Sequence, residues 1–167
     1  MSSRTLVTDS QDVIGLKVEY MEPFVQAALT VLEEVSGSSP EPGPLGLAGT
    51  TFPAASTNIA ARVGGCLAGD VVYSMSGPTA RELAGMITGA KAHGFGRVMG
   101  SALARLGEML ARETGLALFR QGLDCVVSSP IIFQGLNVEF TVVEPALSVP
   151  IETSAGRLLV SVAVRNA

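Results

Sequence analysis

Residues 99–115, MGSALARLGEMLARETG, carry the pattern that decides the fold. Their apolar side chains recur every three or four residues, which is the spacing of a helix with one face on a core. We expect this helix to run from about Arg97 to Gln121, with Gly122 as its terminator. The residues predicted to face the core are Met99, Ala102, Leu103, Leu106, Met109, Leu110 and Ala117.

A second stripe along the same helix contains only small residues. Glycine inside a helix costs about 1 kcal/mol relative to alanine, so repeated glycines need a physical reason. Either another element packs very close to this stripe, or the surface stays flat for a docking partner, and we favour close packing. The stripe consists of Gly100, Ala104, Gly107, Ala111 and Gly115.

Three charged residues, Arg105, Glu108 and Arg112, lie beside the small stripe at spacings that allow an ion ladder. The simplest interpretation is a solvated ladder that contributes about 0.2–0.5 kcal/mol per pair. The alternatives are that this face binds a partner or carries out chemistry. Glu113 is predicted nearer the apolar face, either partly buried with a partner or at its rim.

The pattern on either side of this helix predicts an α+β domain. Residues 1–15 are expected to form a tail and residues 16–167 a single domain. A second helix is predicted over 21–35 and a third over 76–90, with Ser76 as the N-cap. Because hairpin strands surround the helices, we expect long helices packed on an antiparallel sheet. Strands are predicted at 16–20, 46–53, 56–65, 70–76 and 123–133, with two or three more over 137–164.

Individual residues place the predicted turns. Gly69-Asp70 suits a hairpin turn, Pro130 a bend or strand edge, and 153–156 the last turn of the chain. The stretch 36–46 is rich in Gly, Pro and Ser, which predicts a loop. In the helix over 76–90, the residues expected to face inward are Leu83, Met86 and Ile87.

Composition excludes several classes of protein. With 47% hydrophobic and 16% charged residues and a mean hydropathy of +0.43, the chain cannot be disordered, and a compact fold with a subunit interface is favoured. No apolar run approaches the roughly 20 residues of a spanning helix, and residues 1–15 lack a secretory apolar core. We therefore expect a cytoplasmic protein with no membrane partner. A net charge of −4 without a Lys/Arg cluster argues against nucleic acid.

The cysteines and the histidine give no sign of a metal site or a cofactor. Cys66 and Cys125 form no CxxC pair and have no His nearby, so we expect two buried strand thiols. His93 lies in a Gly-rich joint and is expected to have a surface or capping role. Neither a Gly-rich phosphate loop nor a dinucleotide fingerprint is present, so no cofactor is expected.

Four stretches resemble successive blocks of the CheX-type members of the CheC/CheX/FliY family of chemotaxis phosphatases. The resemblance implies paired long helices over an antiparallel sheet, a homodimer, and hydrolysis of the aspartyl phosphate of the response regulator CheY. The blocks are KVEYMEPFVQAA (17–28), LAGDVVYSMSGPTARELAGMITG (67–89), SALARLGEMLA (101–111) and VPIETSAGRLLVSVAV (149–164).

The chain departs from this family at the active motif, which is Glu-x-x-Asn on a helix, with Ser or Asp one turn earlier and Pro in the following strand. The family's Asn orients the attacking water, and its Glu pairs with a lysine of the regulator. With Pro130 as the strand proline, Arg105 stands where Glu is expected and Glu108 where Asn is expected. Ser101 takes the position one turn earlier, and no Asn is predicted on a helix to restore the motif.

The two departures have physical consequences. An Asn amide both donates and accepts hydrogen bonds, whereas the Glu108 carboxylate only accepts and would enter an anionic site. Like unit charges about 4 Å apart repel by about 4 kcal/mol at an effective dielectric constant of about 20. We therefore expect a protein that binds a CheY-like receiver without the usual catalytic pair, through Ser101, Arg105, Glu108 and Arg112. The alternatives are an active phosphatase that uses Glu108 and Arg105, and a structural dimeric interaction domain.

Overall fold

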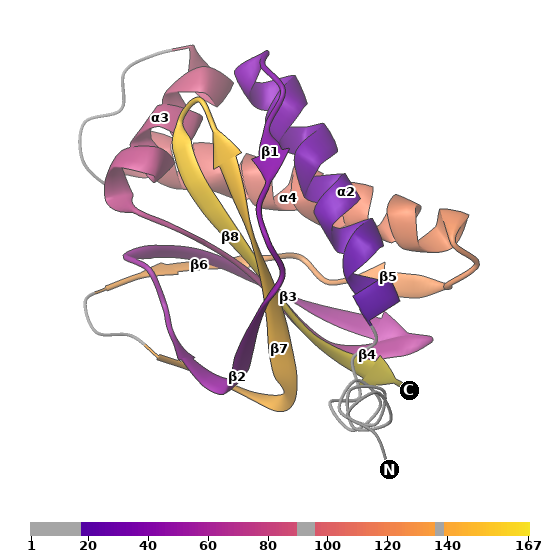
Figure 1. Ribbon diagram of the computed structural model, residues 1–167. Helices are drawn as coiled ribbons and strands as arrows, with labels where there is room; N and C mark the ends of the chain where they lie inside the picture. The colour runs from indigo at the N-terminus through magenta and orange to yellow at the C-terminus, as the bar shows by residue number, and fades with distance from the viewer. Residues whose placement is uncertain (1–17, 90–95, 136–138) are drawn as a thin grey trace.

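The computed structural model describes residues 18–89, 96–135 and 139–167, in which helices gather on one side of an antiparallel sheet (Figure 1). The helices are α2 (Val18–Ser36), α3 (Gly77–Thr88) and α4 (Arg97–Arg120). The strands are β1 (Glu41–Pro42), β2 (Gly46–Pro53), β3 (Thr57–Gly65), β4 (Leu67–Met75), β5 (Cys125–Val127), β6 (Ile131–Gln134), β7 (Glu139–Thr153) and β8 (Gly156–Asn166).

The strand order is β1-β7-β8-β4-β3-β5, and β2 also pairs with β7 while β6 also pairs with β3. Every pairing is antiparallel, which confirms the predicted class of long helices on an antiparallel sheet. The turn predicted at 153–156 joins β7 to β8. None of the helices in the described part of the chain is long and apolar enough to cross a membrane.

The core lies between the helices and one face of the sheet. Because successive strand residues point to opposite faces, one register row crosses four strands and meets the helices. That row joins Ile59, Tyr73, Val160 and Val149, all of them buried. On the opposite face, β2 and the first half of β7 add a small cluster of Phe52, Ala146 and Ala163. Both faces of the central strands are therefore covered.

The strand predicted over 16–20 is wrong for the residues that are described. Residues 18–20 form the first turn of α2, so Pro23 lies inside the helix and not in its first turn. The short alternation also fits a helical period, because Val18, Met21 and Val25 are three and four residues apart. Burial of Met21 and Phe24 against the core decides for the helix.

The turn predicted at Gly69-Asp70 is also wrong, because β4 starts at Leu67 and runs through both residues. The chain reverses at Gly65 and Cys66 instead. Gly69 has φ +155°, and a Cβ there would lie 1.9 Å from the Ala163 carbonyl oxygen on β8. The glycine therefore permits a close strand approach, which looks like a turn signal in the sequence.

The two cysteines are not buried as predicted. Cys66 is exposed at the reversal between β3 and β4, and Cys125 is only half-buried at the start of β5; both are free thiols. The predicted loop over 36–46 includes the two-residue strand β1 and the first residue of β2. His93 and the tail over 1–15 lie outside the described residues.

The limits of α3 and α4 agree with the predicted signals. The Ser76 hydroxyl accepts a hydrogen bond from the Thr79 N–H, and Gly89 ends α3 in the left-handed region at φ +74°. Leu83 is buried as expected, but Met86 is 36% exposed because it lies at the edge of the packed face. Gly122, with φ +81°, follows the end of α4.

Candidate functional site

The long helix α4 carries the site that the sequence predicts. Its apolar face is buried as expected at Met99, Leu103, Leu106 and Leu110, and both α2 and α3 pack against it. Met109 and Ala117 are only half-buried, so the inward face is narrower than predicted.

The small stripe of α4 has two different roles along its length. A Cβ at Gly107 would lie 2.6 Å from Pro130 Cγ and 3.1 Å from Ile59 Cγ2, so close packing is confirmed there. A Cβ at Gly100 or Gly115 would meet no atom within 4 Å, so close packing is wrong for these two. Gly107 is therefore the position of this stripe at which α4 packs tightly on the sheet, and Thr114 makes a further contact through its hydroxyl, 3.3 Å from the Tyr73 hydroxyl on β4.

Pro130 supports α4 at this point from a fixed position. It lies between β5 and β6, where the chain bends as predicted. Ser128 anchors the bend on β3, because its N–H donates to the Arg62 carbonyl at 2.8 Å and its hydroxyl accepts from the Arg62 N–H at 2.9 Å. Gly107 lies between Arg105 and Glu108 in sequence. Its contact with Pro130 therefore fixes the distance of this part of α4 from the sheet.

Arg105, Glu108 and Arg112 are exposed and line one hollow of about 560 Å³. The other lining residues are Ala104 and Met109 of α4 and Glu34 of α2. Ser101 is exposed on the same helix but is not among the residues that line the hollow. The structure therefore brings together three of the four predicted site residues.

Glu34 is the member of this hollow that sequence reasoning missed. It lies near the end of α2 and is exposed, as a solvent-facing helix residue would be. Only the packing of α2 along α4 brings its carboxylate to the same hollow as the two arginines.

The predicted ion ladder is not formed. The ion pairs among the described residues are Arg62–Asp70, Arg157–Glu152 and Arg165–Glu144, and none involves the hollow. An exposed pair gains little over water and loses side-chain entropy, so the charges can stay apart. Two arginines and two glutamates thus surround the hollow unpaired with any described residue, and Glu113, half-buried, is likewise in no such pair.

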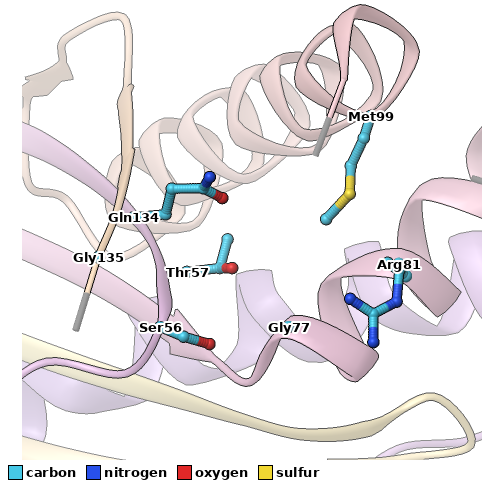
Figure 2. Close-up of a pocket in the computed structure, with 7 residues that line it drawn as sticks. All are labelled: Ser56, Thr57, Gly77, Arg81, Met99, Gln134 and Gly135. Atoms are coloured by element: carbon cyan, nitrogen blue, oxygen red, sulfur yellow. The ribbon is translucent and has the colours of Figure 1, made fainter. Parts of the chain in front are cut away.

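A second hollow, of about 360 Å³, lies where the start of α3 faces the first residue of β3 and the end of β6 (Figure 2). No residue of this hollow was predicted as a site. The described residues that line it are Ser56, Thr57, Gly77, Arg81, Met99, Gln134 and Gly135.

No protein-family model matches this chain, and no curated protein matches it significantly. Solved structures share its fold. Chemotaxis protein CheX from Desulfovibrio desulfuricans has a TM-score of 0.78 at 18% identity, over 90% of this chain and 100% of that chain. A CheC-like superfamily protein from Shewanella sp. PV-4 has 0.77 at 16%, over 90% and 100%. CheX from Borrelia burgdorferi, in a complex with CheY, BeF3 and Mg²⁺, has 0.70 at 21%, over 90% and 100%. The chain therefore has the fold of these chemotaxis proteins.

Proposed function

We propose that this protein is a CheX-like chemotaxis protein that binds a CheY-like receiver through the exposed face of α4. The observation that carries the proposal is the hollow in which Arg105, Glu108, Arg112 and Glu34 are unpaired with any described residue. The Borrelia CheX, which has the same fold, is in a complex with CheY. A receiver is therefore the partner class that the fold suggests.

The chemistry of the hollow suits a protein surface with acidic groups. Arginine guanidinium groups bind carboxylates and phosphates through two parallel hydrogen bonds, and neither Arg105 nor Arg112 is in an ion pair with a described residue. Ala104 and the half-buried Met109 supply an apolar patch between the charges, as at the centre of many interfaces. The small, open positions at Gly100 and Gly115 leave the flanks of this face flat.

We propose that this protein binds the receiver without accelerating the loss of its phosphate. A water-orienting residue must both accept from and donate to its neighbours, and the Glu108 carboxylate can only accept. Close to a phosphoryl group it also adds a like charge, which opposes attack. Arg105 puts a base where the family motif has an acid, and Glu108 puts an acid where the motif has a neutral amide, whereas the supporting contact between Gly107 and Pro130 is present.

Binding is tested by titrating the protein with CheY-like receivers from the same genome, with and without BeF3 and Mg²⁺. We expect at least one receiver to bind, and the double variant Arg105→Ala/Glu108→Ala to weaken that binding at least tenfold. Arg120→Ala is the control, because Arg120 is exposed on the last turn of the same helix, outside the hollow. Failure of every receiver to bind in either state would exclude this function. A double variant that changes neither binding nor stability by more than about 0.5 kcal/mol would favour the structural dimeric interaction domain.

Catalysis is tested by following receiver aspartyl phosphate over time with and without the protein. We expect the same rate in both cases. If the wild-type protein accelerates the loss and Glu108→Ala abolishes the effect, the alternative of an active phosphatase with Glu108 and Arg105 is correct.

A further inference from the structure

We propose that the hollow at the start of α3 binds a small molecule through a phosphate or carboxylate group. Its volume of about 360 Å³ falls within the roughly 300–1,000 Å³ of small-molecule sites. It shares no lining residue with the hollow over Arg105 and Glu108, so the two sites can be tested separately.

Thr57 is the residue that points to a ligand. The residue is 2% exposed, and Figure 2 shows its hydroxyl in the hollow, on the side that faces Arg81. This hydroxyl makes no hydrogen bond to another described residue. The hydroxyl oxygen is not among the fully enclosed polar atoms that lack a partner in the described residues, so it opens into the hollow, where an oxygen atom of a bound ligand can accept its hydrogen bond.

Arg81 and Ser56 converge on the same space above Gly77. A Cβ at Gly77 would lie 3.5 Å from Arg81 Nη1 and 3.8 Å from Ser56 Oγ, so the missing side chain leaves room between a guanidinium and a hydroxyl. Arg81 is in no ion pair with a described residue, and it can make two parallel hydrogen bonds to an oxyanion.

The backbone at the start of α3 adds one further donor. The Thr79 N–H is used by the Ser76 hydroxyl, the Ala80 N–H by the Ser76 carbonyl, and Pro78 has none. The Gly77 N–H is therefore the terminal donor available to a ligand, in a position where the helix dipole favours an anion.

The charge and shape of the lining select the ligand class. Among the described residues that line the hollow, Arg81 is the single ionisable one, so within this part of the chain a bound oxyanion would meet a positive charge and no carboxylate. Met99 forms an apolar wall, and the Gln134 amide can donate or accept. This arrangement suits a small metabolite with one anionic group and a short, partly apolar body.

The site is tested by nitrogen-15 NMR of the full chain, with inorganic phosphate and butyrate as separate probes. We expect saturable shifts of the Thr57 and Gly77 amide signals with at least one probe, and the responding probe distinguishes a phosphate from a carboxylate ligand. Arg81→Gln and Thr57→Val should each weaken that binding at least tenfold, and Arg120→Gln should leave it unchanged.

Gly77→Ala provides a second test, because its methyl group occupies the space of the ligand at ordinary contact distances and the helix start tolerates alanine. If Arg81→Gln or Thr57→Val does not give the spectrum of a folded protein, the loss of binding expected in Gly77→Ala tests the site in its place. The proposal is overturned if neither probe shifts these signals saturably, or if all variants bind as the wild type does.

Discussion

At the scale of single residues, Gly107 determines how closely α4 approaches the sheet. We expect Gly107→Ala to lower the free energy of unfolding by about 1–3 kcal/mol, because its Cβ would meet Pro130 Cγ at 2.6 Å. The better helix propensity of alanine offsets only about 1 kcal/mol of this cost. Urea unfolding measures the change.

Gly115→Ala is the matched control, since no atom lies within 4 Å of its Cβ. This variant should be up to about 1 kcal/mol more stable than the wild type. If the two alanine variants had the same stability, the contact with Pro130 would not be what requires glycine at position 107.

Tyr73 makes the free energy of unfolding depend on pH in the alkaline range. Burial raises the pKa of its phenol to about 12, although its hydrogen bond with Thr114, at 3.3 Å, lowers the pKa in part. In the unfolded chain the pKa is about 10, so that state releases the proton first. The contribution of Tyr73 is therefore complete below about pH 10 and is lost as the pH rises towards about 12.

The variant Tyr73→Phe should remove this part of the pH dependence and cost about 1 kcal/mol at neutral pH, because the Thr114 hydroxyl loses its partner. Urea unfolding at neutral and alkaline pH measures both effects. Tyr20→Phe is the control, since the Tyr20 hydroxyl donates to Asn166 Oδ1 in an exposed hydrogen bond. An unchanged alkaline loss in Tyr73→Phe would contradict the assignment.

At the scale of elements, the pairing of β4 with β8 depends on Gly69. We expect Gly69→Ala to lower the melting temperature by several degrees, because a Cβ there would lie 1.9 Å from the Ala163 carbonyl and the strands must move apart. About 1 kcal/mol corresponds to about 2–4 °C in a chain of this size. Gly64→Ala on β3 should have little effect, since nothing lies within 4 Å. Equal melting temperatures for both variants would exclude this explanation.

The elements also show which sequence signals are reliable. The helix over 97–120 was predicted within one residue, because its apolar period and the terminating Gly122 agree. The signal at 16–20 was too short to separate a strand from a helix, and contact with the core decided it. The turn prediction at Gly69-Asp70 was wrong because a sequence does not distinguish a glycine that allows close approach of a neighbouring strand from a glycine that allows a turn.

At the scale of the whole molecule, we propose that the protein forms a homodimer, as the family resemblance implies. The edge formed by β5 and β6 carries Val126 at 71% and Ile131 at 69% exposure. An open strand edge with apolar side chains favours pairing with a second copy. Light scattering should give twice the monomer mass of 17.2 kDa. The double variant Val126→Lys/Ile131→Lys should give the monomer mass, and a monomeric wild type would exclude the dimer.

The sequence by itself determined the class of fold, the long helix, its inward face and the exposure of Arg105, Glu108 and Arg112. These features depend on local periodicity, which is a property of neighbouring residues in one element. Only the tertiary structure decided that Glu34 joins these residues, that Gly107 rests on Pro130, and that Thr57 and Arg81 face one hollow. The physical reason is that such juxtapositions arise from the packing of separate elements, and no spacing along the chain encodes them.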